Sequence, residues 1–262
     1  YDHLGGGFHR YSTDGRWLVP HFEKMLYDNA QLVRLYLDGW RLSREPRFRH
    51  VVEETLEYLR REMVHPEGGF YTAQDADSEG HEGKYFVWEP TEIREILGLD
   101  LGETFCRLYD ITDQGNFEGK NIPNLIHANG RININDLPDA EQMIAGARRT
   151  LLEVRERRVK PLRDDKILTG WNGLMISGVL DAYQTLGNPA YLAMAEKALA
   201  FLLERAYHNG RLFRTVTGGQ GKLNGYLDDY AFLSAALIDA FEATAQPAYL
   251  DKARELTAVM LE

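Results

Sequence analysis

The chain repeats itself at long range, and this feature limits the folds open to it more than any other. After a shift of 143 positions, Asn29 falls on Asn172 and Pro46 on Pro189, and after a further 58 positions Pro189 falls on Pro247. Each copy reads as a long apolar helix, a short turn with proline, a second helix, and then glycine with aromatic residues. Periods of several tens of residues are typical of repeat architectures. The copies are therefore predicted to be helical hairpins.

The spacing of apolar residues predicts where these helices lie. From Phe22 to Trp40 they recur every three or four residues, as on one face of a helix. Pro46 suits the first turn of a second helix, and Pro66 with the glycines after it ends that helix. The same shift of 143 also places Phe70 on Phe213. The further predicted helices cover 140–158, 168–186, 189–206, 226–243 and 247–262.

The two helices of each hairpin differ in character. The first is apolar nearly all round, as in 174–180, whereas the second alternates charged and apolar residues, as in 192–205. A buried inner helix with a half-exposed outer partner, repeated along the chain, indicates an all-α fold of the solenoid or toroid type. We expect a single α/α toroid domain over 1–262 that is incomplete in this chain.

The stretch from 72 to 137 interrupts the repeat. Lys84–Trp88 reads as a short strand, and Gln114–Asn116 and Asn129–Gly130 read as turns. An insertion of this length with structure of its own is more often functional than idle. We expect a small β-containing cap over one end of the helical arc.

Composition excludes several classes of function. Asp and Glu number 40 against 30 Lys and Arg, for a net charge of −10, which argues against a nucleic-acid partner. The longest uncharged apolar stretch, 167–180, is too short and too polar to span a bilayer. Cys106, the single cysteine, excludes an internal disulfide and is predicted to be buried and inert. We predict a fragment of a longer protein, because the chain starts at Tyr1 rather than Met and resembles no targeting peptide there. The low cysteine content favours a cytoplasmic location.

Standard signatures of catalysis or cofactor binding are absent. Gly115–Lys120 is one residue short of a phosphate-binding loop, and the sequence has neither a GxSxG nor an HExxH motif. The run from Asp75 resembles the opening of a calcium loop, but Phe86 stands where that loop needs a glutamate. We predict no metal and no cofactor, and leave a metal in another geometry as the alternative.

Ionisable residues nevertheless cluster near the predicted helix starts. His21, Lys24 and Asp28 are spaced to share one helix face, where burial is costly without a purpose. Their face either lines a central pocket or forms a buried ion-pair network. Asp75 and Asp77 form either a carboxylate pair for acid–base chemistry or a turn in which their side chains bond the backbone.

The repeat places further polar and aromatic residues at matching positions. Asp28, Trp171 and Asp229 hold equivalent or nearly equivalent places in successive copies, so in a toroid they point to a common centre. Trp171 and Tyr230 offer flat apolar faces, and carboxylates with amides bond hydroxyls, which together suit a sugar ring. Of Asp228 and Asp229, we expect one to cap the helix and the other to be free.

Seven segments of the sequence form a specific pattern: Asp2–Ser12, Trp17–Leu32, Asp75–Gly80, Glu82–Trp88, Asp165–Lys166, Trp171–Leu174 and Asp229–Ala231. These segments resemble the spermatogenesis-associated protein 20 family of thioredoxin-domain-containing proteins. The resemblance implies a thioredoxin-like domain followed by an (α/α)6 toroid, similar to N-acylglucosamine 2-epimerase and the six-hairpin glycosidases. It implies a fold and a site location rather than a reaction. By analogy with those enzymes, His21 with His3 or His9, or a pair among Asp28, Asp77 and Asp229, would move protons.

Our leading hypothesis is a sugar-active enzyme, epimerase-like or glycosidase-like, with proton transfer in the central pocket. The alternatives are a non-catalytic binding module that partners a thioredoxin-like domain, and clusters that are structural networks only. The predicted partner is a small molecule, a sugar, and neither nucleic acid nor membrane. The predicted catalytic residues are His21, Asp28, Asp77 and Asp229. The predicted substrate-binding residues are Arg10, Lys24, Asn29, Asp75, Trp88, Lys166, Trp171, Asn172 and Tyr230.

Overall fold

The computed structural model describes residues 1–126 and 140–261, which form two compact units. The first, here called the mixed unit, comprises Tyr1–Glu23 and Asp75–Leu162. The second, here called the hairpin unit, comprises Lys24–Gln74 and Arg163–Glu262. The predicted turn at Asn129–Gly130 lies outside the described residues. These units do not follow the predicted 72–137 boundary, and the division into one domain with an insertion stays a prediction.

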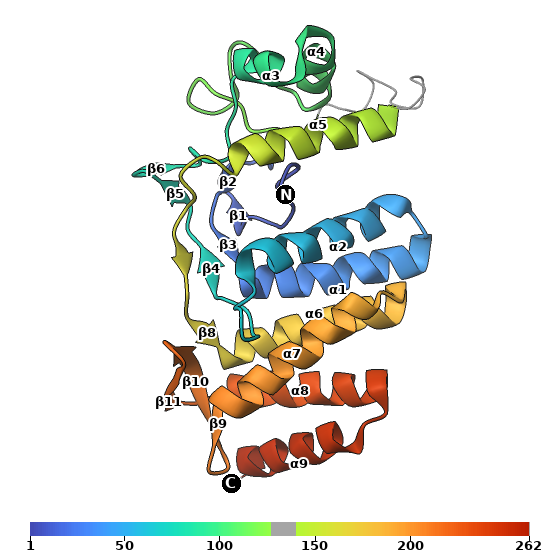
Figure 1. Ribbon diagram of the computed structural model, residues 1–262, viewed down its shortest axis with the longest axis vertical. Coiled ribbons are helices and arrows are strands. Elements are labelled where there is room, and N and C mark those ends of the chain that lie inside the picture. The colour runs from blue at the N-terminus through green and yellow to red at the C-terminus, as the bar shows by residue number, and fades with distance from the viewer. Residues whose placement is uncertain (127–139, 262) are drawn as a thin grey trace. The chain divides into compact units, whose positions relative to one another are not determined.

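The hairpin unit contains the three predicted helical hairpins (Figure 1). Their inner helices have 18 residues each and start at positions separated by the predicted 143 and 58 residues. The inner helices are α1 (Leu26–Ser43), α6 (Thr169–Leu186) and α8 (Leu227–Thr244), and the outer helices are α2 (Pro46–Tyr58), α7 (Pro189–Arg205) and α9 (Pro247–Leu261). A short π-helical turn, η1 (Leu59–Met63), extends α2.

Local chemistry explains where these helices begin and end. Every outer helix has proline at its first position, where a missing N–H costs nothing. Every inner helix ends in a left-handed residue whose N–H donates to the carbonyl four residues earlier. Those three residues are Arg44, Gly187 and Ala245.

The inner helices pack side by side in the order α1, α6, α8, and all three start at the edge where the short strands lie (Figure 1). Glycines permit the close approach. A Cβ added to Gly173 would lie 2.6 Å from the carbonyl carbon of Phe232, and one added to Gly178 would lie 3.1 Å from the carbonyl oxygen of Ala30. Met175, Ile176 and other apolar residues of α6 are fully buried, as its all-round apolar sequence predicts.

Short strands lead into the inner helices. One sheet has the order β3 (Lys24–Met25), β4 (Ala73–Gln74), β7 (Arg163–Asp164), and another has the order β11 (Gln220–Asn224), β10 (Arg211–Thr217), β8 (Ile167–Leu168), with β9 (Tyr207–His208) also paired to β10. The prediction of a helix from Phe22 was wrong at its start. The backbone of Lys24 and Met25 is extended because it pairs with Gln74 and Ala73, so the helix begins only at Leu26.

The mixed unit holds short elements around a core of its own. Its helices are α3 (Pro90–Leu97), α4 (Leu99–Leu108) and α5 (Ala140–Arg155), and its strand pairs are β1 (Tyr11–Ser12) with β2 (Pro20–His21) and β5 (Asp77–Ser78) with β6 (His81–Glu82). The predicted strand over Lys84–Trp88 was wrong. The N–H groups of Phe86 and Val87 both donate to the carbonyl of Gly83 and wind the segment into turns, and only Trp88 forms a bridge, with Asn121.

A buried ion pair joins two distant segments of the mixed unit. Arg155 donates from both terminal nitrogens to the carboxylate of Asp2, at 2.9 and 2.8 Å. The guanidinium also lies over the rings of Tyr85 and Phe86, 5.0 and 5.3 Å from their centroids. Cys106 is buried as predicted, and burial raises the pKa of its thiol to about 11.

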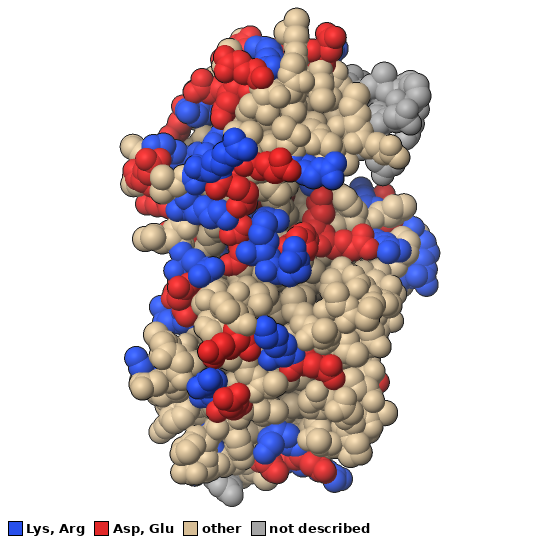
Figure 2. Space-filling model, viewed as in Figure 1, with Lys and Arg blue, Asp and Glu red and all other residues tan. Residues whose placement is uncertain are grey.

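Charged residues of both signs are intermixed on the face seen in Figure 2, with no broad basic surface there. Among residues 1–126 and 140–261, no helix combines the length and apolar character needed to cross a bilayer.

Candidate functional site

Three inner helices of the hairpin unit present side chains from the same position at the same end. Asp28, Trp171 and Asp229 are the third residues of α1, α6 and α8, in agreement with the repeat. The ring of Tyr27 meets that of Trp171 edge-on, with 4.7 Å between centroids. The Gly170 N–H then donates to Oδ1 of Asp229 at 2.8 Å. These contacts form a continuous line that we call the helix-start row: Tyr27, Asp28, Gly170, Trp171, Arg214, Tyr226, Asp228 and Asp229.

Asp229 anchors the α8 end of this row. Its side chain is almost fully buried, and Oδ2 accepts from the Tyr226 N–H at 2.9 Å and from Nη1 of Arg214 at 3.1 Å. Burial raises the pKa of its carboxyl, although the N–H groups of Tyr226 and Gly170 and the Arg214 charge oppose this shift. Asp229 is therefore an acid that keeps its proton to a higher pH than a free aspartate.

Arg214 pairs with both the buried Asp229 and the more exposed Asp228. Its Nη1 lies 3.3 Å from Oδ1 of Asp228, and its guanidinium lies 4.6 Å from the centroid of the Tyr226 ring. Burial disfavours the charge on Arg214, yet the two aspartates raise its pKa overall. The expectation that one aspartate would be free was wrong, because Asp228 pairs with Arg214. Sequence reasoning missed Arg214, since the pairing of β10 with β8 and with β11 is what brings that strand to the helix starts.

Asn172 and Tyr230, both predicted to bind substrate, tie the hairpins together. The Asn172 side chain accepts from the Phe70 N–H at 2.7 Å and donates to the Phe70 carbonyl at 2.9 Å. The Tyr230 hydroxyl accepts from the Leu212 N–H at 2.9 Å. Each is the fourth residue of its helix, and each holds the link that follows the preceding hairpin. The polar groups of Asn172 therefore have a structural role that the prediction did not include.

The link after α2 and the link after α7 do not align by a constant shift of 143. Val64 pairs with Phe70 as Tyr207 pairs with Leu212, so Phe70 is equivalent to Leu212 rather than to Phe213. The link after α2 has one residue more, which a constant shift of 143 does not register.

Asn29 is the fourth residue of α1. It is buried, and it donates to the Met25 carbonyl at 2.9 Å, as Asn172 does to Leu168.

The two predicted lysines lie in different surroundings. Lys24 is 1% exposed, and its ammonium group lies 4.3 Å from the centroid of the Tyr58 ring. Lys166 is half-exposed and pairs with Asp164 at 2.6 Å. The expectation that His21, Lys24 and Asp28 share a helix face was wrong, since His21 lies in β2 and Lys24 in β3.

A second group of ionisable residues, here called the imidazole cluster, lies in the mixed unit. Nδ1 of His21 is 2.7 Å from Oε1 of Glu82, and its Nε2 is 3.7 Å from Oε2 of Glu23. Arg10 pairs with Glu23 at 2.9 Å, and the ring of Tyr11 stacks on the imidazole with 5.1 Å between centroids. The sequence prediction included His21 and Arg10 but neither glutamate, because Glu82 lies 61 residues from His21 and only the folding of the unit brings the two side chains together.

The other predicted residues of the mixed unit are not equally accessible. Asp75 and Asp77 are exposed, and Asp77 lies opposite Glu82 in the β5–β6 pair. Trp88 is completely buried, with the Arg158 guanidinium 3.9 Å from its ring centroid, so it offers no face to a ligand. Among the described residues, no three His, Cys, Asp or Glu side chains are grouped as a metal site would need.

Comparisons with solved structures define the fold. The cellobiose 2-epimerase of Spirochaeta thermophila matches 98% of this chain over 47% of its own, with a TM-score of 0.60 and 10% identity. The unsaturated glucuronyl hydrolase of Bacillus sp. GL1 matches 98% of this chain over 51% of its own, with a TM-score of 0.55 and 14% identity. The predicted all-α toroid is confirmed: the chain has the fold of the (α/α)6 toroid enzymes and corresponds to part of such a toroid.

Sequence comparison identifies relatives. No protein-family model matches the chain. Human spermatogenesis-associated protein 20 is 34% identical over 294 residues, which cover 97% of this chain and 37% of the human protein. The predicted resemblance is confirmed, and this chain is homologous to about a third of that relative's length.

Proposed function

We propose that the hairpin unit binds a sugar along the helix-start row and supports proton transfer of the epimerase or glycosidase type. One observation carries the proposal: aromatic rings, three carboxylates and a guanidinium from separate hairpins lie in one line at the ends of α1, α6 and α8. The sugar-active enzymes among the structural neighbours support it through their shared fold.

Each group suits a distinct task in sugar binding. The half-buried rings of Trp171 and Tyr27 would pack against the C–H face of a sugar. Asp228, whose side chain is 43% exposed, would accept hydrogen bonds from hydroxyl groups, with Arg214 as the matching donor. Asp229 would hold Arg214 in position, because backbone N–H groups and Arg214 already occupy its oxygens.

We assign proton transfer in this unit to Asp28. It occupies in α1 the place that Asp229 occupies in α8, and it is half-buried beside Tyr27. A partly desolvated carboxylic acid is a usual proton donor or acceptor in this chemistry. Participation of Asp77 and of His21, oriented by Glu82, stays a prediction, because both belong to the other compact unit.

A test of the proposal is titration calorimetry against a panel of mono- and disaccharides, including mannose and cellobiose. We expect one sugar to bind, with the affinity lost on Trp171→Ala and retained in Asp28→Asn. Asp38→Asn, at a carboxylate on the other end of α1, is the matched control and should change nothing. No binding by the unchanged chain to any sugar of the panel would contradict the proposal.

The non-catalytic alternative has an observation in its favour. Asp229 is fixed by three donors, an arrangement that suits recognition as well as reaction. Incubation of the bound sugar in D2O separates the two functions. An epimerase of the deprotonating type incorporates deuterium, a hydrolase yields new reducing ends, and a binding module does neither. Partnership with a thioredoxin-like domain remains part of this alternative.

A further inference from the structure

The hairpin unit contains two equivalent junctions where a link meets the next outer helix. At the first, the link after α2 meets α7, and at the second, the link after α7 meets α9. The backbone pairing described above makes Gly69 equivalent to Arg211, since these residues precede Phe70 and Leu212. The period of 58 makes Phe201 equivalent to Val259.

The first junction is closed. A Cβ added to Gly69 would lie 2.9 Å from Cδ1 of Phe201, and one added to Gly68 would lie 2.5 Å from the Lys197 carbonyl oxygen. Phe201 itself is 4% exposed. The aromatic ring therefore packs directly against the glycine link.

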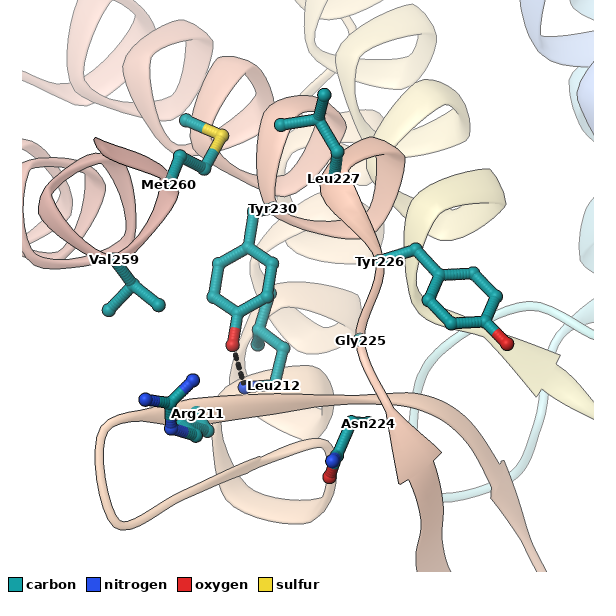
Figure 3. Close-up of a pocket in the computed structure, with 9 residues that line it drawn as sticks. All are labelled: Arg211, Leu212, Asn224, Gly225, Tyr226, Leu227, Tyr230, Val259 and Met260. Atoms are coloured by element: carbon teal, nitrogen blue, oxygen red, sulfur yellow. Dashed lines mark hydrogen bonds between the residues drawn. The ribbon is translucent and has the colours of Figure 1, made fainter. Parts of the chain in front are cut away.

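The second junction is open and forms a solvent-accessible cavity of about 270 Å³ (Figure 3). Val259 is much smaller than the phenylalanine of the first junction, so the wall on the α9 side recedes. The cavity is lined by Arg211, Leu212, Asn224, Gly225, Tyr226, Leu227, Tyr230, Val259 and Met260.

The lining combines an apolar wall with one cation. Leu227, Val259 and Met260 supply apolar surface, and the ring of Tyr230 stands among them with its hydroxyl bonded to the Leu212 N–H (Figure 3). Neither the Arg211 guanidinium nor the side-chain amide of Asn224 bonds to any residue that the structure describes. The lining includes no carboxylate. The cavity is therefore locally positive at Arg211, although the net charge of the chain is −10.

We propose that this cavity binds a small organic acid with one aromatic or branched apolar group. The carboxylate would pair with Arg211 and accept from Asn224, since guanidinium and carboxylate match in geometry. The apolar group would pack on Met260 and the ring of Tyr230. A dry cavity of ~150 Å³ already admits benzene, so this volume accommodates one ring with a short acidic chain. The site is separate from the proposed sugar site and does not depend on it.

The test uses 3-phenylpropionate and its neutral amide as matched probes, titrated into the chain and followed by NMR. We expect the acid to bind with Kd in roughly the millimolar range, as ligands of this size do. The amide should bind about tenfold more weakly, because it cannot form the charged hydrogen bond with Arg211. Arg211→Gln should remove this difference, because the variant can form that bond with neither probe. Arg254→Gln, on the exposed surface of α9, is the control and should leave the difference intact.

Val259→Phe is the most decisive variant, because it places at the second junction the phenylalanine that closes the first. It should abolish binding of both probes while the helical circular dichroism is retained. Equal binding of acid and amide, undiminished binding by folded Val259→Phe, or no saturable response at about ten times the expected Kd would each overturn the proposal. If Val259→Phe does not fold, the probe pair with Arg211→Gln decides the question alone.

Discussion

The two compact units each hold an arginine bound to an aspartate beside an aromatic ring, but they differ in access to solvent. In the mixed unit, the side chains of Asp2 and Arg155 are 4% and 3% exposed. In the hairpin unit, Asp229 is similarly buried at 2%, whereas Arg214 is 24% exposed and Asp228 is 43% exposed. The first pair is sealed inside the protein, and the second leads from the interior to the surface.

This difference shows that residue type alone does not identify a functional site. Arg155 and Asp2 satisfy each other with two hydrogen bonds and hold the N-terminal segment to α5. Arg214 connects a buried carboxylate to an exposed one, so a ligand can reach part of the network. Access, together with the aromatic rings of the row, is why the second cluster and not the first supports the proposed function.

The largest effect on stability is expected at the buried Asp2–Arg155 pair. Arg155→Ala leaves Asp2 buried without its cation, which should lower the free energy of unfolding by about 3–5 kcal/mol. Urea denaturation measures the loss. Arg157→Ala, at an exposed arginine just beyond α5, serves as the control with little change. A loss below about 1 kcal/mol would show that the pair is not sealed as described.

A smaller loss of stability is expected at Asp229, the buried end of the cluster formed with Arg214 and Asp228. Asp229→Ala removes the acceptor for the Gly170 and Tyr226 N–H groups, and we expect about 1–3 kcal/mol of destabilisation in the same assay. Asp229→Asn retains an acceptor oxygen and should lose less. If both variants are as stable as the unchanged chain, Asp229 does not anchor the row.

Asp229 should also influence how the stability of the protein depends on pH. Burial raises the pKa of Asp229 in the folded state above its ordinary value of 3.8, so the folded protein keeps this proton when the unfolded chain has lost it. The contribution of Asp229 to stability is therefore greatest at low pH and falls as pH rises from about 3.8 to the folded pKa. The difference between the curves of the unchanged chain and Asp229→Asn should show this fall. A difference curve that rises over that interval contradicts the assignment.

The smallest effect on stability is expected at the exposed end. Asp228→Asn should change the free energy of unfolding by less than about 1 kcal/mol, because exposed ion pairs contribute little. In the proposed site it should weaken sugar binding about tenfold, since a charged hydrogen bond is lost. Thermal unfolding and calorimetry measure the two effects. Unaltered sugar affinity would remove Asp228 from the site but leave the comparison of the clusters intact.

Much of the hairpin unit could be predicted because its signals are local or periodic. Prolines at 46, 189 and 247 begin the outer helices, and apolar spacing gives the inner ones. The same period placed Asp28, Trp171 and Asp229 at equivalent helix positions. The predicted start at Phe22 and the predicted strand at Lys84–Trp88 failed where distant pairing or a left-handed glycine overrides local preference.

The sequence by itself determined the repeated helical hairpins and the prolines that start each outer helix, because helix period and proline act over a few residues. Only the tertiary structure decided which polar groups are available. Strand pairing of β10 brings Arg214 to Asp229, the folding of the mixed unit brings Glu82 to His21, and packing commits Asn172 to the backbone of Phe70. Packing also leaves a cavity beside Val259, whereas the equivalent Phe201 packs against the glycine link. Such outcomes depend on residues far apart in the chain, which no local pattern records.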